Sequence, residues 1–173
     1  MIARLASLVP IAGLLATPAF AEVKSASPTG FEVERSAIVA RTPAQVYAVI
    51  GDIGSWWDPA HTYSGKAANL RLDLKAGGCF CEALANGGSV QHLVVVYADP
   101  DHGIRLQGAL GPLQSQAVTG TLSWSFKPVQ GGTEIKQNYF VSGAIRGGAE
   151  AFAAPVDQVL GGQFDRLVTK LKP

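Results

Sequence analysis

Residues 116–128, "QAVTGTLSWSFKP", constrain the fold more than any other segment, because apolar and polar side chains alternate along them. One parity carries Val118, Leu122, Trp124 and Phe126, and the other carries Thr119, Thr121, Ser123 and Ser125. Successive side chains of a strand point to opposite faces. The segment therefore predicts a strand of an antiparallel sheet with one buried and one solvated face.

Other segments have the same strand character and are separated by turn residues such as Asn86-Gly87-Gly88 and Gly131-Gly132. They cover residues 31–41, 68–75, 78–84, 89–98, 104–110 and 133–143. This order predicts a curved antiparallel sheet of about seven strands.

Two helices are predicted. Thr42 is placed to cap a helix over residues 42–52, and Pro43 suits its first turn. Residues 53–65 are rich in Gly, Pro and Ser, which indicates one or two short helices or an ordered loop. Residues 149–171 carry one apolar stripe at helical spacing, with Pro155 expected in the first turn or at a kink. The stripe consists of Phe152, Val156, Leu160, Phe164, Leu167 and Leu171. We expect an α+β domain whose long terminal helix covers one face of the sheet.

The N-terminus has the order of a secretory signal peptide. Arg4 precedes an apolar run that ends in Ala19-Phe20-Ala21, so residues 1–21 predict a signal with cleavage before Glu22. Prolines in the run argue against a spanning helix and thus against a stable membrane anchor. We expect a periplasmic or secreted protein with an N-terminal extension at 22–30 and one domain at 31–173.

Composition and motifs exclude several functions. Loss of residues 1–21 removes one basic and no acidic residue, so the net charge falls from +1 to zero, which argues against a nucleic-acid partner. The sequence contains no GxxxxGK[ST], GxSxG or HExxH pattern, so ATP hydrolysis and these kinds of hydrolase lack support. No cofactor is predicted.

Three features together resemble a known superfamily. They are "ARTPAQVYAVIGDIGSWWDP" (40–59), "LDLKAGGCF" (72–80) and the amphipathic terminal helix. The chain resembles helix-grip domains, which include START-type lipid-transfer domains, the birch-pollen allergen, aromatic polyketide cyclases and homologues of the activator of the heat-shock chaperone ATPase. This resemblance implies a hydrophobic cavity between sheet and terminal helix and a small hydrophobic molecule as partner.

The only two cysteines, Cys79 and Cys81, lie on the same face of a predicted strand. In a straight strand their Cα atoms would be about 6.6 Å apart, so a disulfide requires the strand to buckle. Two other interpretations remain open. The pair could be small buried apolar residues, or it could bind a metal together with His92.

Glu82 shares a strand face with Phe80. Within the resemblance, an aromatic residue at this position faces the cavity, which would place Glu82 inside it or at its rim. Burial would raise the pKa of this carboxyl unless a cation such as Arg105 or Arg71 paired with it. The alternative is an exposed glutamate.

Residues 53–65 also contain candidate site residues. Of Trp56 and Trp57, one could close the core while the other forms a lid over the cavity, and His61 and Tyr63 would lie at its mouth. Inward polar residues of the last strands need hydrogen-bond partners, either each other or a ligand. The expected ligand-lining residues are Trp56, Trp57, Phe80, His92, Leu106, Trp124, Gln137, Tyr139, Phe152 and Phe164.

We favour an exported protein that binds a lipid-like, polyketide-like or aromatic ligand. One alternative is a cyclase or dehydratase that uses Glu82, His61 and Tyr63 as proton-transfer groups. Another is a metal- or redox-responsive module built on Cys79 and Cys81. The sequence sets neither the identity of the ligand nor the oligomeric state.

Overall fold

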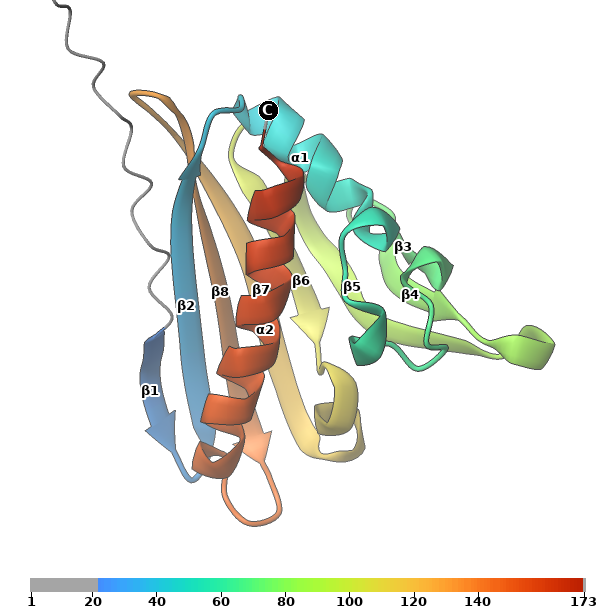
Figure 1. Cartoon of the computed structure of the whole chain (residues 1–173). Helices are drawn as coiled ribbons and strands as arrows, with labels where there is room; N and C mark the ends of the chain where they lie inside the picture. The colour runs from blue at the N-terminus through green and yellow to red at the C-terminus, as the bar shows by residue number, and fades with distance from the viewer. Residues whose placement is uncertain (1–21, 173) are drawn as a thin grey trace, which may run out of the picture.

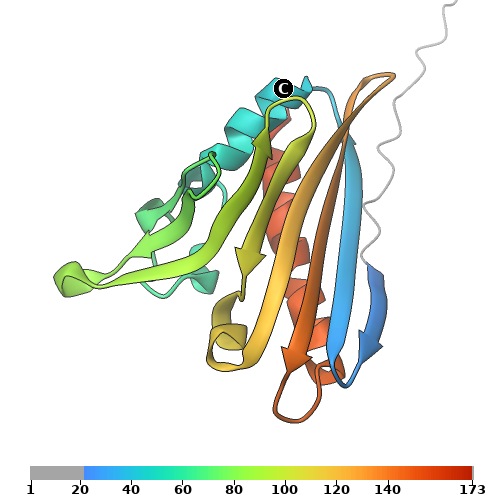
Figure 2. The same ribbon diagram turned by 180° about the vertical axis from the view of Figure 1, so that it is seen from behind.

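The computed structural model describes residues 22–172, so the predicted signal peptide lies outside the described residues. Eight strands form one antiparallel sheet in the order β1-β2-β8-β7-β6-β5-β4-β3, and α2 crosses one face of it (Figures 1 and 2). The strands are β1 (Glu22–Ser27), β2 (Gly30–Val39), β3 (Leu70–Leu72), β4 (Cys79–Ala83), β5 (Ser89–Asp99), β6 (Gly103–Gly108), β7 (Ala117–Val129) and β8 (Gly132–Ala144). The helices are α1 (Pro43–Gly51) and α2 (Glu150–Lys170). The prediction of an α+β helix-grip fold is confirmed.

Five short 3-10 helices complete the chain. They are η1 (Ile53–Ser55), η2 (Pro59–His61), η3 (Ala67–Asn69), η4 (Ala85–Gly87) and η5 (Gly111–Ser115). The helices η1 to η3 follow α1 and lie beside β3 and β4, so they cover the end of the sheet that α2 does not reach (Figure 1).

The long strands β7 and β8 pair without interruption from Ala117↔Ala144 to Val129↔Gly132. Leu122, Trp124 and Phe126 are buried, as their parity predicts. An uninterrupted register keeps the apolar side chains of both strands on the face that α2 covers.

The α2 helix buries the C-terminal part of its predicted stripe. Leu160, Phe164, Leu167 and Leu171 are buried, whereas Phe152 and Val156 are half-buried. Pro155 lies inside the helix, beyond its first turn.

The α1 helix begins as predicted. Thr42 accepts a hydrogen bond from the Gln45 N–H, and the Gln45 side chain accepts one from the Thr42 N–H, which makes a capping box. Val46 and Ile50 face the core. The Trp56 indole N–H donates to the carbonyl of Val49 and attaches η1 to α1.

Two elements differ from the sequence-based prediction. The expected N-terminal extension contains β1, which pairs with β2 at the edge of the sheet. The expected strand at 68–75 is shortened to β3, because η3 takes up residues 67–69. Within residues 22–172, no helix is both long and apolar enough to cross a membrane.

Large side chains pack the layer between the sheet and α2. Phe31, Trp124, Tyr139 and Phe164 are each less than 2% exposed. A pocket of about 560 Å³ lies outside this layer, between η1 and the C-terminal half of α2. Its lining residues are Ser55, Trp56, Asp165, Arg166, Thr169 and Lys170.

Candidate functional site

The cysteine pair shapes the strand on which the site is built. Cys79 and Cys81 form a disulfide, and their Cα atoms are 5.3 Å apart. This separation is shorter than the roughly 6.6 Å of a straight strand, so β4 is buckled at this point. Both cysteines are half-buried, whereas Phe80 and Glu82 are buried on the opposite face.

The neighbouring strand β5 has a β-bulge beside the disulfide. Phe80 pairs with Leu93 and Cys81 pairs with Gln91, so His92 has no partner residue on β4. A bulge inserts one extra residue and re-aims side chains. As a result His92 and Leu93 are both buried, although they are consecutive residues.

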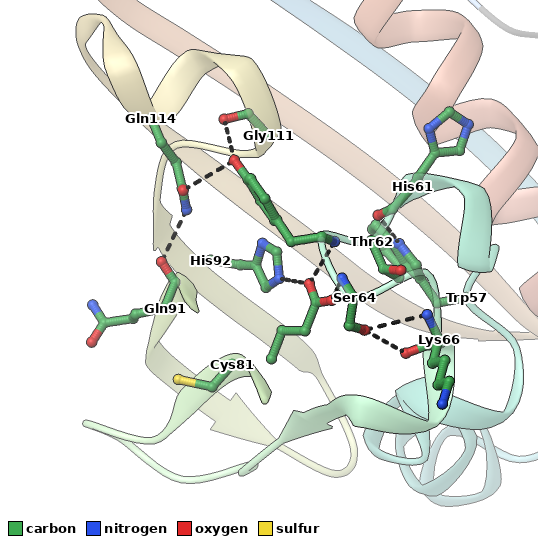
Figure 3. A network of polar contacts seen from close by, with 12 residues as sticks. Trp57, His61, Thr62, Ser64, Lys66, Cys81, Gln91, His92, Gly111 and Gln114 are labelled. Carbon is green, nitrogen blue, oxygen red and sulfur yellow. Dashed lines mark hydrogen bonds and ion pairs between the residues drawn. The ribbon is translucent and has the colours of Figure 1, made fainter. Parts of the chain in front are cut away.

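The Glu82 carboxylate lies at the centre of a polar network (Figure 3). Its Oε1 accepts a hydrogen bond from the Ser64 N–H at 2.5 Å, and its Oε2 accepts one from the Tyr63 N–H at 3.1 Å. His92 Nε2 lies 3.0 Å from the same Oε2. Glu82 is 1% exposed, so these contacts replace the solvation of its carboxylate.

The predicted arginine partners of Glu82 are wrong. Arg71 is exposed, and the exposed Arg105 guanidinium lies 5.7 Å from the centre of the Tyr97 ring. Two backbone N–H groups and a histidine, rather than a cation from a neighbouring strand, stabilise the buried carboxylate.

Glu82 and His92 differ in charge. Burial alone would raise the pKa of Glu82, but hydrogen bonds from Ser64, Tyr63 and His92 outweigh it and lower the pKa. Burial lowers the pKa of His92, and Glu82 only partly opposes this effect. Near neutral pH the site therefore holds an ionised Glu82 and a neutral His92, whose Nε2 carries the proton shared with the carboxylate.

Aromatic rings surround this pair. The ring centres of Phe80 and His92 are 4.8 Å apart, and those of Trp57 and Phe80 are 5.4 Å apart. The Tyr63 ring lies 5.9 Å from His92 on the outer side. Four rings from three segments of the chain thus form one continuous cluster, which we call the aromatic cluster.

Tyr63 connects two loops at the outer edge of the aromatic cluster. Its hydroxyl donates to the Gly111 carbonyl at 3.2 Å and lies 3.4 Å from Gln114 Oε1 (Figure 3). Gln114 in turn donates to the Gln91 carbonyl of β5. Tyr63 is 55% exposed, so it covers the site from the solvent side.

The other residues of the loop are placed differently from the prediction. His61 is exposed and its ring points away from His92 and Ser64, while its carbonyl accepts from the Trp57 indole (Figure 3). Trp56 and Trp57 are both buried, so the prediction that one of them forms a lid is wrong. Tyr63 has that position instead.

The polar residues of the last strands point inward, as their parity predicts. Trp124, Gln137 and Tyr139 are each at most 2% exposed. The Tyr139 hydroxyl accepts from the Leu110 N–H, and burial raises the pKa of Tyr139 to about 12. Gly120 leaves room for this ring, since a Cβ there would lie 2.6 Å from it. Leu106 is fully buried beside them.

The disulfide also bears on the metal alternative. Bridged sulfurs are not thiolate ligands, so in this form Cys79 and Cys81 offer His92 no partner for a metal. Among residues 22–172, no group of three or more His, Cys, Asp and Glu side chains is placed to hold a metal ion.

The structure adds a buried ion pair that sequence reasoning missed. Arg35 of β2 is 8% exposed, and its Nη2 lies 2.8 Å from Asp157 Oδ1 of α2. A signal was available, because Arg35 has the same parity as Phe31 and Val33 in an otherwise apolar row. Gln163 was also missed, although it is fully buried and accepts a hydrogen bond from the Asp58 N–H.

Solved structures share this architecture. A protein from Rhizobium leguminosarum is 18% identical with a TM-score of 0.59, over 90% of this chain and 98% of that one. CalU16 from Micromonospora echinospora is 11% identical with a TM-score of 0.57, over 91% and 88%. The di-domain ARO/CYC StfQ from the steffimycin biosynthetic pathway is 14% identical with a TM-score of 0.53, over 83% of this chain and 51% of that one. At these identities the likeness shows the fold alone, which is that of the helix-grip class.

The family model for "polyketide cyclase / dehydrase and lipid transport" matches residues 30–172. The chain therefore belongs to this family, within the superfamily that the sequence resembles. Such membership indicates binding of a hydrophobic ligand or a cyclase role. No curated protein matches the chain.

Proposed function

We propose that this protein binds a small, largely apolar molecule between the sheet and α2, with the Tyr63 loop (residues 62–66) as its cover. The observation that carries this proposal is the state of Glu82. Both of its oxygens accept hydrogen bonds from the backbone of this loop, and Oε2 also faces His92. A carboxylate engaged in this way, with a lowered pKa, is a poor proton donor. Glu82 therefore fits the role of holding the loop better than that of a catalytic acid.

Family membership supports the apolar nature of the ligand. The face under α2 offers mainly Val, Leu, Ile and aromatic side chains, and burial of apolar surface stabilises a complex by roughly 25 cal/mol per Å². These side chains pack closely, so ligand binding requires the layer between sheet and helix to expand. The loop that Glu82 holds is exposed to solvent at Tyr63, and in this proposal it is the segment that moves to admit the ligand.

Export of the protein is part of the same proposal. The signal-like sequence of residues 1–21 supports it, and so does the disulfide, because disulfides persist in oxidising compartments. Such a compartment would make the protein a periplasmic or secreted carrier.

One observation favours a second candidate function, a cyclase or dehydratase. The 3.0 Å contact between Glu82 and His92 resembles a general base whose ring a carboxylate orients. In this alternative His92, and not His61, would move the proton, because the His61 ring points away from the site.

Binding of the neutral fluorescent probe N-phenyl-1-naphthylamine, together with native mass spectrometry of protein isolated without reductant, tests the proposal. A carrier should bind the probe saturably or retain an organic adduct, and Glu82→Gln and His92→Gln should keep the affinity within about threefold. A folded protein with neither probe binding nor adduct would contradict the proposal. Substrate turnover that His92→Gln abolishes while binding persists would establish the enzyme instead.

A further inference from the structure

Four buried N–H groups find no hydrogen-bond acceptor within residues 22–172. They are Arg35 Nε, Trp124 Nε1, Gln137 Nε2 and Gln163 Nε2. Buried polar groups of native proteins are nearly always hydrogen-bonded, so several unpaired donors in one layer require an explanation.

Three of these donors form a row across the sheet. Arg35 of β2 lies opposite Gln137 of β8, and Gln137 lies opposite Trp124 of β7. Side chains at directly opposite positions have Cβ atoms about 5 Å apart. All three are buried on the face under α2, and we call them the donor row.

The donor row can be completed only by an acceptor. The guanidinium and the indole have no acceptor atom. Gln163 of α2 supplies one more buried donor, because its Oε1 already accepts the Asp58 N–H and its Nε2 is left to donate. Within residues 22–172, the buried side-chain atoms without a hydrogen bond are these four donors and one acceptor, Asp157 Oδ1, so donors are in excess.

The charges around the donor row disfavour an anionic ligand. Asp157 lies 2.8 Å from Arg35 and balances its charge. The negative charge of Asp157 would in turn repel a second carboxylate. The Gln and Trp donors are neutral, so they add no positive charge to offset a second anion beside Asp157.

Apolar side chains flank the donor row on the sheet and on α2. Those next to it along β7 and β8 are buried, and so are those above it on the helix. They include Leu122, Phe126, Ile135, Leu160 and Phe164. A complementary molecule would combine an apolar body with an uncharged acceptor.

From these contacts we infer that the interior takes a neutral, carbonyl-bearing molecule, such as a hydrophobic ketone or ester, whose oxygen accepts hydrogen bonds from the donor row. This inference rests on the proposed binding function and adds the chemical class of the ligand.

Three matched probes test the inference: fluorene, 9-fluorenone and fluorene-9-carboxylate. They share a ring system and differ in having no acceptor, a neutral carbonyl or a charged carboxylate. Fluorenone should bind on the order of tenfold more tightly than fluorene, since each hydrogen bond contributes modestly, and the carboxylate should bind more weakly than the ketone. Fluorenone should also shift the indole N–H resonance of Trp124 downfield in ¹H–¹⁵N spectra, leaving those of Trp56 and Trp57, which donate to backbone carbonyls, in place.

Trp124→Phe removes the N–H while keeping an aromatic ring, and Gln137→Met removes the amide at similar size. Each variant should reduce the preference for fluorenone over fluorene to within about twofold, while fluorene still binds. If only one of the two variants folds, that variant alone is enough for the test. Ser123→Ala, on the opposite face beside Trp124, is the matched control and should keep the preference.

The possible outcomes separate the two proposals. Equal binding of fluorene and fluorenone without a Trp124 shift would overturn the carbonyl inference and leave apolar binding intact. Preferential binding of the carboxylate would also overturn the carbonyl inference. So would evidence that, with fluorenone bound, the Trp124 N–H contacts only a buried water molecule. Failure of both neutral probes to bind would count against the proposed function, and the inference would fall with it.

Discussion

The two ends of the sheet are organised by different forces. At one end β2, β8 and β7 are long, pair without a shift and are covered by α2. At the other end β3 and β4 are short, the pairing of β4 with β5 shifts register, and short 3-10 helices replace the long helix. Apolar burial suffices for the first end. The second end depends on a disulfide and a buried carboxylate, so single polar substitutions should matter most there.

The largest effect is expected at Glu82. Glu82→Ala leaves two loop N–H groups and His92 without their acceptor, which should lower the free energy of unfolding by about 3 kcal/mol or more. Glu82→Gln keeps an acceptor and should lose less. Urea denaturation measures both changes. Asp73→Asn, at an exposed ion pair with Lys75, is the control and should change stability by less than about 1 kcal/mol. An equally small loss in Glu82→Ala would show that the carboxylate does not hold the loop.

At the α2 end the critical position is a glycine. A Cβ on Gly161 would lie 2.1 Å from Arg35 Cζ, so Gly161→Ala should displace the guanidinium and lower the free energy of unfolding by about 1–3 kcal/mol. Gly162→Ala is the matched control, since a Cβ there meets nothing within 4 Å and alanine favours the helix by roughly 1 kcal/mol. Thermal unfolding measures both variants, and the melting temperature should fall in Gly161→Ala and rise in Gly162→Ala. A change in the same direction in both variants would contradict this packing.

The disulfide between Cys79 and Cys81 should contribute less to the free energy of unfolding. Replacing both Cys79 and Cys81 by serine removes a cross-link that closes a very short loop, which the chain-entropy relation values at about 1–2 kcal/mol. The loss should be local. Hydrogen exchange should become faster at β4 and β5 amides near His92, while β7 and β8 amides keep their protection. If exchange became faster in all strands, or did not change in β5, the disulfide would not be what maintains the bulge at His92.

The difference between the two ends also explains what the sequence predicts well. Alternation in residues 116–128 and the stripe of α2 arise from burial, and burial follows from residue type and spacing. The inward position of Glu82 follows from parity with Phe80. His92 was also expected to line the interior and is buried, but the bulge that places it there leaves no mark in the hydrophobic pattern. Two of the donors to the Glu82 carboxylate are backbone N–H groups, which every sequence contains, so the predicted arginine partners were wrong.

The smallest effect is expected from the titration of His92. Burial lowers the pKa of His92 below 6.5, so the unfolded chain binds a proton at a higher pH than the folded protein does. Stability from this group is therefore present above pH 6.5 and declines as the pH falls below it. The pKa of Glu82 is lowered from 4.5, so its contribution declines only at lower pH, where the carboxylate takes up a proton. His92→Gln keeps a donor for Glu82 but does not titrate, and it should flatten the decline that begins near pH 6.5. His61→Gln, at an exposed ring outside the network, is the control and should keep the wild-type profile. If denaturation midpoints of wild type and His92→Gln fell in parallel from pH 7 to 5, His92 would not be held neutral, and the polar end of the sheet would depend on Glu82 alone.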